Sequence, residues 1–157
     1  DVDRIEVSIP PMRYQRHFHA EVKTGLRGKF AINYVVALGI LEGKLDNDTF
    51  TDGKANDPLV QQALRRVYVI IDDSIPEPGT YCPVTIELKN GKRLSHTARI
   101  AKGHPENPMT ESEVLAKFRN NANGIISAER SQQLIGALKN LEELADLREL
   151  AGFLRPA

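Results

Sequence analysis

The residues best suited to chemistry lie in a short basic stretch that leads into the most apolar run of the chain. Gly25, Gly28 and Lys29 precede residues 30–41, which are nearly all apolar and predict a helix buried inside the protein. The first turn of a helix carries free N–H groups and a partial positive charge, so a lysine there is unfavourable unless an anion lies beside it. The arrangement, with glycines that leave the approach flexible, predicts a carboxylate or phosphate site at Lys29. A lysine that simply points into water is the alternative that the residue types leave open.

A local excess of positive charge surrounds this stretch. Residues 11–30 hold five basic side chains and one acidic side chain, together with His17 and His19. Such an excess either faces solvent or attracts something negative, for example an acidic small molecule.

Other common kinds of site are missing from the sequence. We find no phosphate-binding loop of the Walker type, no dinucleotide fingerprint, no paired CxxC and no HExxH motif. His17 and His19 could present two imidazoles on one side of an extended segment, but a metal needs further ligands, and His96 and His104 are the only other histidines. We therefore expect neither a metal nor another cofactor.

The composition excludes several classes of partner. The chain of 157 residues has 21 basic and 21 acidic side chains, so no overall field favours nucleic acid or an anionic membrane. No apolar run is long enough to cross a bilayer. The single cysteine, Cys82, excludes an internal disulfide and is typical of a reducing compartment, so we expect a cytoplasmic protein in which Cys82 is a small strand residue.

The elements that must position the basic stretch follow from periodicity and from capping residues. Alternation of apolar and polar residues predicts strands, and Asn90-Gly91 predicts a hairpin between the last two of them. Capping residues predict helices after Asp57, Thr110 and Ser127, a last helical stretch follows over 141–154, and Asp72-Asp73 is expected to cap a turn. The expected strands are 2–9, 67–71, 83–89 and 93–100, with a loop at 76–79. Strands that cluster in this way indicate an α+β two-layer sandwich with a mainly antiparallel four-stranded sheet packed by helices.

We expect residues 1–157 to form a single domain that belongs to a larger protein. The chain begins at Asp1 rather than Met, directly with a strand pattern, and its very apolar helix needs to be covered. Both features are typical of a domain excised from a longer chain.

Two stretches of the sequence combine several motifs. The first is TGLRGKFAINYVVALGILEGKLDNDTFTD, in which a Lys-Phe pair opens a buried helix that ends in a glycine. The second is HPENPMTESEVLAKFRNNA, with a Pro-x-Asn-Pro segment followed by a capping box. Both stretches resemble segments of the MmgE/PrpD family. The order of the intervening strands is similar as well, so the resemblance covers nearly the whole chain.

The resemblance implies that this chain is the C-terminal α+β domain of a two-domain enzyme whose N-terminal domain is helical. Family members include 2-methylcitrate dehydratase, which takes part in propionate metabolism, cis-aconitate decarboxylase and iminodisuccinate epimerase. The family implies a homodimeric lyase or isomerase that removes a proton beside a carboxylate of a di- or tricarboxylate, without a cofactor. Its active site lies between the two domains, so this domain alone is expected to be inactive.

The resemblance also assigns roles to individual residues. Lys29 falls on the family's basic active-site position, where it can neutralise a substrate carboxylate or transfer a proton. Thr24 and Arg27 are expected to bind the same carboxylates, and His19 is a weaker candidate for acid–base work. Ala31 departs from the serine that is common in the family, and Arg27 departs from an acidic residue often found nearby, which favours a more anionic substrate.

A second hypothesis needs no chemistry. The same basic segment could dock an acidic partner surface, in which case the protein is a binding or dimerisation module.

Overall fold

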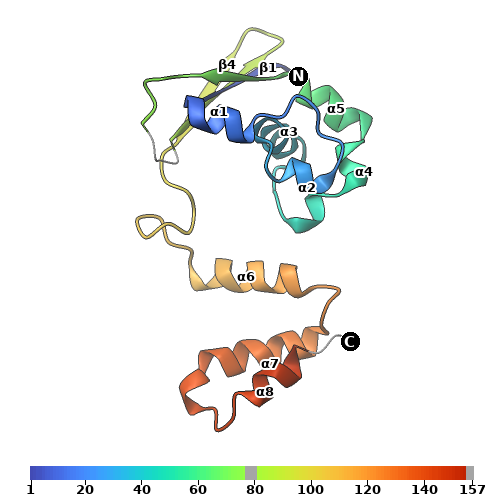
Figure 1. Ribbon diagram of the computed structural model, residues 1–157, viewed down its shortest axis with the longest axis vertical. Coiled ribbons are helices and arrows are strands. Elements are labelled where there is room, and N and C mark those ends of the chain that lie inside the picture. The colour runs from blue at the N-terminus through green and yellow to red at the C-terminus, as the bar shows by residue number, and fades with distance from the viewer. Residues whose placement is uncertain (77–80, 155–157) are drawn as a thin grey trace. The chain divides into compact units, whose positions relative to one another are not determined.

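The computed structural model describes residues 1–76 and 81–154 and divides the chain into two compact units, Asp1–Asn107 and Pro108–Ala157. Figure 1 labels their elements. The single domain expected over 1–157 stays a prediction. The part of the expected loop 76–79 that falls on residues 77–79 lies outside the described residues.

A four-stranded sheet forms one layer of the first unit, with the strand order β2-β1-β3-β4. Its strands are β1 (Val2–Ile9), β2 (Val67–Ile71), β3 (Cys82–Leu88) and β4 (Arg93–Ala98). The α+β class is confirmed, and two of the three strand pairs, β1–β3 and β3–β4, are antiparallel. The pair β1–β2 is parallel, so the sheet is mixed. A parallel pair needs a long crossover, and the helices between β1 and β2 supply it.

The predicted hairpin joins β3 to β4. Gly91 has a positive φ of 81°, and the Lys92 backbone N–H donates to Asn90 Oδ1 over 3.0 Å. The Asn90-Gly91 turn therefore forms as the sequence predicts, because glycine adopts positive φ without steric cost.

The crossover of the first unit contains more helices than the sequence predicts. They are α1 (Pro11–His17), α2 (Gly25–Gly28), α3 (Ile32–Glu42), the 3₁₀ helix η1 (Asn47–Thr49), α4 (Asp52–Ala55) and α5 (Pro58–Leu64). The basic segment after β1 is partly helical, and Pro11 occupies a first-turn position of α1 where its missing N–H costs nothing. Asp57 caps α5 as predicted, but the helix ends at Leu64 because β2 begins three residues later.

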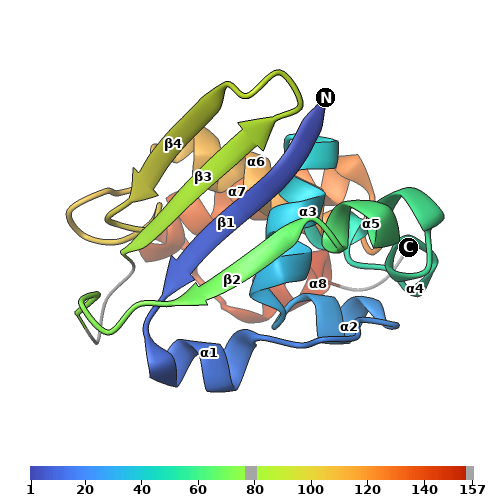
Figure 2. The same ribbon diagram turned by 90° about the horizontal axis from the view of Figure 1, so that it is seen from above.

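Helix α3 is the buried helix that the apolar run predicts. Its Tyr34 and Leu38 side chains are fully buried and share one apolar cluster with Ile5 and Val7 of β1. Figure 2 shows α3 crossing behind the sheet. At the C-terminal end of the helix the apolar side chains are less covered, and Leu41 is 46% exposed. Gly43 ends α3 with a positive φ of 68°, as expected for a C-terminal glycine.

The second unit is helical. Its elements are α6 (Glu111–Ala122), α7 (Ala128–Lys139), the 3₁₀ helix η2 (Leu141–Glu143) and α8 (Arg148–Phe153). The predicted capping box of Thr110 and Glu113 and the predicted Ser127 cap are confirmed. The continuous helical stretch expected over 141–154 is wrong, because Asp146 Oδ1 accepts a hydrogen bond from the Arg148 backbone N–H and starts a new helix there.

Candidate functional site

Thr24, one of the four predicted site residues, is the N-cap of α2. Its backbone is extended, and its hydroxyl oxygen accepts a hydrogen bond from the Arg27 backbone N–H over 3.2 Å. This is the usual geometry of an N-cap. The hydroxyl proton is not used in that bond, so Thr24 can still donate to an anion.

The two glycines of α2 are required by close packing. A Cβ atom on Gly25 would lie 2.1 Å from the Phe50 carbonyl oxygen, and one on Gly28 would lie 2.4 Å from Cε1 of the Tyr34 ring. The Gly25 backbone N–H also donates to Asp52 Oδ1 over 2.8 Å. The expectation of a flexible glycine approach is therefore wrong, because both glycines fix α2 tightly against its neighbours.

Lys29 is not in the first turn of the buried helix, which corrects the argument from the helix dipole. It caps the C-terminus of α2, and Ala31 has extended backbone angles that separate α2 from α3. The exposed ammonium donates to Asn47 Oδ1 over 3.2 Å and lies 5.9 Å from the centre of the Phe50 ring. Lys29 thus belongs to the short helix, with its head directed to η1.

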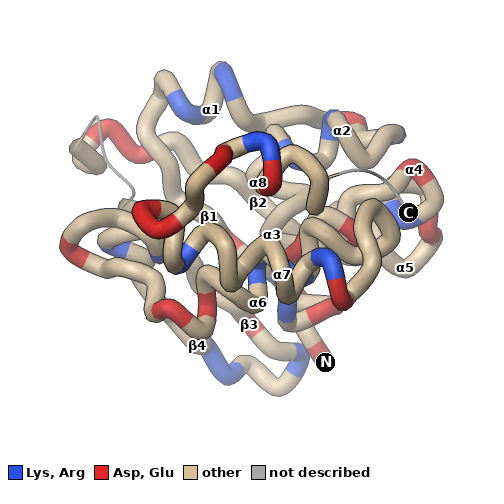
Figure 3. Tube along the Cα trace, turned by 90° about the horizontal axis from the view of Figure 1, so that it is seen from below, with Lys and Arg blue, Asp and Glu red and all other residues tan. Residues whose placement is uncertain are grey.

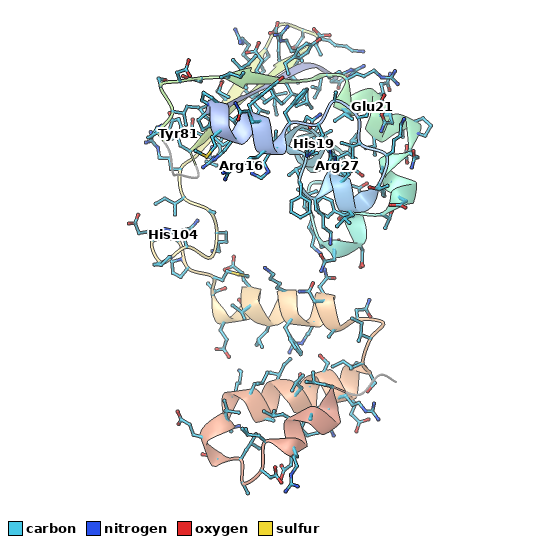
Figure 4. The ribbon with its side chains drawn as sticks, in the orientation of Figure 1. Arg16, His19, Glu21, Arg27, Tyr81 and His104 are labelled. Atoms are coloured by element: carbon cyan, nitrogen blue, oxygen red, sulfur yellow. The ribbon has the colours of Figure 1, made fainter. Side chains whose placement is uncertain are left out.

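His19 lies near enough to Arg27 for the charge of that guanidinium to act on the His19 imidazole. Partial burial lowers the pKa of the half-buried His19, and the positive charges of Arg27 and His17 lower it further. Figure 4 labels His19 and Arg27 on the same side of the first unit. The His19 carbonyl accepts from Asn33 Nδ2 over 2.9 Å, which ties the histidine backbone to α3. Burial and the two positive charges therefore favour the neutral form of the His19 imidazole.

Lys29 does not contact either of these residues. In the part of the chain that the structure describes, no hydrogen bond joins Lys29 to His19 or Arg27. The stretch therefore offers two positive positions, one at Arg27 beside His19 and one at Lys29 beside Asn47. Figure 3 colours the lysines and arginines of α1 and α2 blue. Lys23 is largely neutralised, because it pairs with Glu21 over 2.9 Å at the surface.

Two polar groups that the sequence patterns did not indicate lie at the start of α3. Asn33 Oδ1 and the Tyr34 hydroxyl are buried and find no hydrogen-bond partner among residues 1–76 and 81–154. Burial also raises the pKa of Tyr34. A buried polar atom without a partner costs stability, so such groups tend to be kept for a ligand, a water or a partner. The sequence does contain a sign of these buried polar groups, because the adjacent Asn33 and Tyr34 interrupt an otherwise apolar run.

The histidines do not form a metal centre in the described ranges, where no three His, Cys, Asp or Glu side chains lie close enough together to hold an ion. His96 is on β4, and His104 Nδ1 accepts from the Glu106 backbone N–H over 3.2 Å. None of the described helices combines the length and apolar character needed to cross a bilayer.

Comparison with known proteins places this chain in a family. The model of the MmgE/PrpD C-terminal domain matches residues 1–143. The chain is 28% identical over 156 residues to the human cis-aconitate decarboxylase and 27% identical over 156 residues to that of Mus musculus. Each of these matches covers 98% of this chain but only 32% of the length of the relative. A cis-aconitate decarboxylase-like protein of Aspergillus oryzae is 23% identical over 133 residues, 83% of this chain and 27% of that protein. The chain belongs to the MmgE/PrpD family and corresponds to its C-terminal domain.

Proposed function

We propose that the intact protein is a lyase or isomerase that acts on di- or tricarboxylates by removing a proton beside a carboxylate, and that this chain supplies part of the substrate site. The observation that carries the proposal is the grouping of Thr24, Arg27 and Lys29 in and beside the short helix α2, in a chain of this family. The relatives named as cis-aconitate decarboxylases support a tricarboxylate. An N-terminal helical domain, which would supply further catalytic groups, and a homodimer are part of the same proposal.

The basic side chains would bind the acid groups of the substrate. Arg27 presents a planar guanidinium that can hold a carboxylate through two parallel hydrogen bonds. The Thr24 hydroxyl, which caps the same helix, can donate to the same carboxylate. Lys29 follows Arg27 by two residues, at the C-terminal end of the short helix, and can neutralise a second carboxylate.

His19 and Lys29 are the groups in this chain that can move a proton. The lowered pKa of His19 leaves its imidazole neutral near pH 7, which is the form that accepts a proton. The nearby Arg27 would also hold the substrate carboxylate, so the proton that becomes acidic would lie beside the base. An ammonium such as that of Lys29 can return a proton or stabilise the enolate-like charge that develops.

An exchange experiment tests the proposal whichever of these reactions the protein catalyses. The intact protein is incubated in D₂O with citrate, 2-methylcitrate or cis-aconitate, and proton NMR follows each acid. Proton removal beside a carboxylate replaces carbon-bound hydrogen by deuterium or converts the acid to a new product. We expect exchange or conversion of at least one acid by the intact protein and none by residues 1–157 alone.

The docking module is the competing outcome. The binding-module hypothesis would be favoured by two results together. The first is no exchange and no calorimetric heat with any of the three acids, and the second is tight binding of the protein to an acidic protein surface. Conversion by residues 1–157 alone would contradict the proposed need for a second domain.

A further inference from the structure

A cavity separate from the Arg27 and Lys29 positions opens beside α1. It has a volume of about 340 Å³ and is lined by Ile9, Arg13, His17, Ile32 and Cys82. These residues come from the end of β1, from α1, from the first turn of α3 and from the start of β3. Protein sites for small molecules start at about 300 Å³, so the volume suits a compact ligand.

The polar groups of the cavity lie on one wall. Arg13 and His17 are four residues apart on α1, so their side chains lie on the same face of that helix. The other lining residues are aliphatic or, in the case of Cys82, weakly polar. No carboxylate lines the cavity among the described residues. The lining is therefore cationic on one side and apolar on the other.

The Arg13 guanidinium is only lightly engaged by the protein. It is half-buried, and Nη1 donates to the Tyr81 carbonyl oxygen across a long 3.5 Å. In residues 1–76 and 81–154 it has no carboxylate partner. A guanidinium has five N–H donors and its charge is costly to bury unpaired, so most of its hydrogen-bonding capacity remains for an anion. Tyr81, whose backbone carbonyl accepts this one bond, is labelled in Figure 4.

We propose that this cavity binds a monocarboxylate with a compact apolar body, such as a benzoate-sized or short branched-chain acid. The carboxylate pairs with Arg13 and with His17, and the hydrocarbon packs on Ile9 and Ile32. A second carboxylate on the ligand would meet the apolar wall, where an unpaired charge is strongly unfavourable. The cavity thus selects against the polycarboxylates proposed for the Arg27 and Lys29 positions, and the two proposals stand independently.

Cys82 provides a direct report of occupancy, because it lines the cavity and is the only cysteine of the chain. Burial raises the pKa of its thiol, so alkylation is slow and is best followed at mildly alkaline pH. The 157-residue chain is treated with iodoacetamide, and peptide mass spectrometry measures the rate at which Cys82 is modified. Benzoate is the probe, benzamide is its neutral counterpart, and citrate tests the exclusion of a polyanion.

Benzoate at ten times its dissociation constant is expected to slow Cys82 alkylation about tenfold, whereas benzamide and citrate leave the rate nearly unchanged. In Arg13→Gln the dissociation constant of benzoate is expected to rise about tenfold or more, because one charge-assisted contact is lost. Arg16→Gln is the matched control, since Arg16 lies on the same helix, is exposed and does not line the cavity. Circular dichroism confirms that both variants are folded.

Three results would overturn the proposal. They are the absence of protection by saturating benzoate, equal protection by benzamide, and equal loss of benzoate binding in Arg13→Gln and Arg16→Gln. If Arg13→Gln does not fold, His17→Gln replaces it, with a weaker but still selective loss expected. The polycarboxylate exchange test is unaffected by any of these results.

Discussion

Replacing Gly25 by alanine tests whether α2 is held rigidly in the way the packing indicates. The added Cβ would lie 2.1 Å from the Phe50 carbonyl oxygen and 2.7 Å from the Thr51 backbone nitrogen. Both neighbours are backbone atoms, so relief requires α2 to move away from η1 and α4. The same movement would stretch the hydrogen bond from the Gly25 N–H to Asp52 Oδ1.

The expected change in the free energy of unfolding of Gly25→Ala follows from two opposing effects. Overpacking of this kind costs typically about 1–3 kcal/mol, while alanine gains about 0.5–1 kcal/mol over glycine in a helix when nothing interferes. Gly39→Ala is the matched control, because Gly39 lies in α3 and a Cβ there meets no atom within 4 Å. We expect Gly25→Ala to lower the free energy of unfolding by about 1–2 kcal/mol and Gly39→Ala to raise it by up to about 1 kcal/mol.

Tyrosine fluorescence during urea unfolding measures this difference for the first unit alone. The chain has no tryptophan, and its four tyrosines all lie within residues 1–107. The midpoint and slope of the unfolding curve give the free energy of each variant. A Gly25→Ala protein as stable as Gly39→Ala would refute the close approach of α2 to Phe50, and with it the rigid placement of Arg27.

The remaining predictions concern individual groups of both units. In Arg27→Gln the pKa of His19 is expected to rise towards its ordinary value, because a nearby positive charge is removed. An NMR titration measures this pKa, with the His19 signal assigned by its loss in His19→Gln. An unchanged His19 pKa in Arg27→Gln would show that Arg27 does not act on His19. Tyr34→Phe is expected to leave the free energy of unfolding unchanged or to raise it by up to about 1 kcal/mol, because the Tyr34 hydroxyl has no partner in the described residues. A decrease of more than about 1 kcal/mol in urea unfolding would show that the hydroxyl makes a hydrogen bond. Thr110→Ala removes the capping box of α6 and is expected to lower the free energy of unfolding by about 1 kcal/mol. Far-ultraviolet circular dichroism during unfolding measures this through the helix content. An unchanged free energy of unfolding would show that the capping box does not stabilise α6.

The sequence predicted those features that depend on neighbouring residues. The Asn90-Gly91 turn, the Thr110–Glu113 capping box and Gly43 at the end of α3 each act within a few positions, and each is confirmed. The short helix α2 depends instead on a residue 27 positions away, since Asp52 binds the Gly25 N–H. No pattern of neighbouring residues predicts that contact. The helix α2 was therefore missed, and Lys29 was assigned to the wrong helix.

The roles of the candidate site residues stay predictions. The resemblance assigned carboxylate binding to Thr24 and Arg27, and the residue types indicated an anion site at Lys29. The structure adds the cap bond of Thr24 and the contact of Lys29 with Asn47. The proximity of His19 to Arg27 requires the chain to turn between α1 and α2, and periodicity does not reveal that turn. The cavity beside α1 joins residues as distant in sequence as Ile9 and Cys82 and was not foreseen. The family resemblance, which rested on two motifs, is confirmed over residues 1–143.

The central claim is that the α2 segment binds and helps to transform a polycarboxylate in the intact protein. The most direct measurement is kcat/KM of Lys29→Ala with whichever acid the intact protein converts, compared with Lys44→Ala. Lys44 is a suitable control because its side chain is 74% exposed and pairs with Asp46 at the surface. We expect Lys29→Ala to lose about a hundredfold or more in kcat/KM with little change in stability, while Lys44→Ala stays near the wild type. A Lys29→Ala enzyme as active as the Lys44→Ala enzyme would contradict the claim.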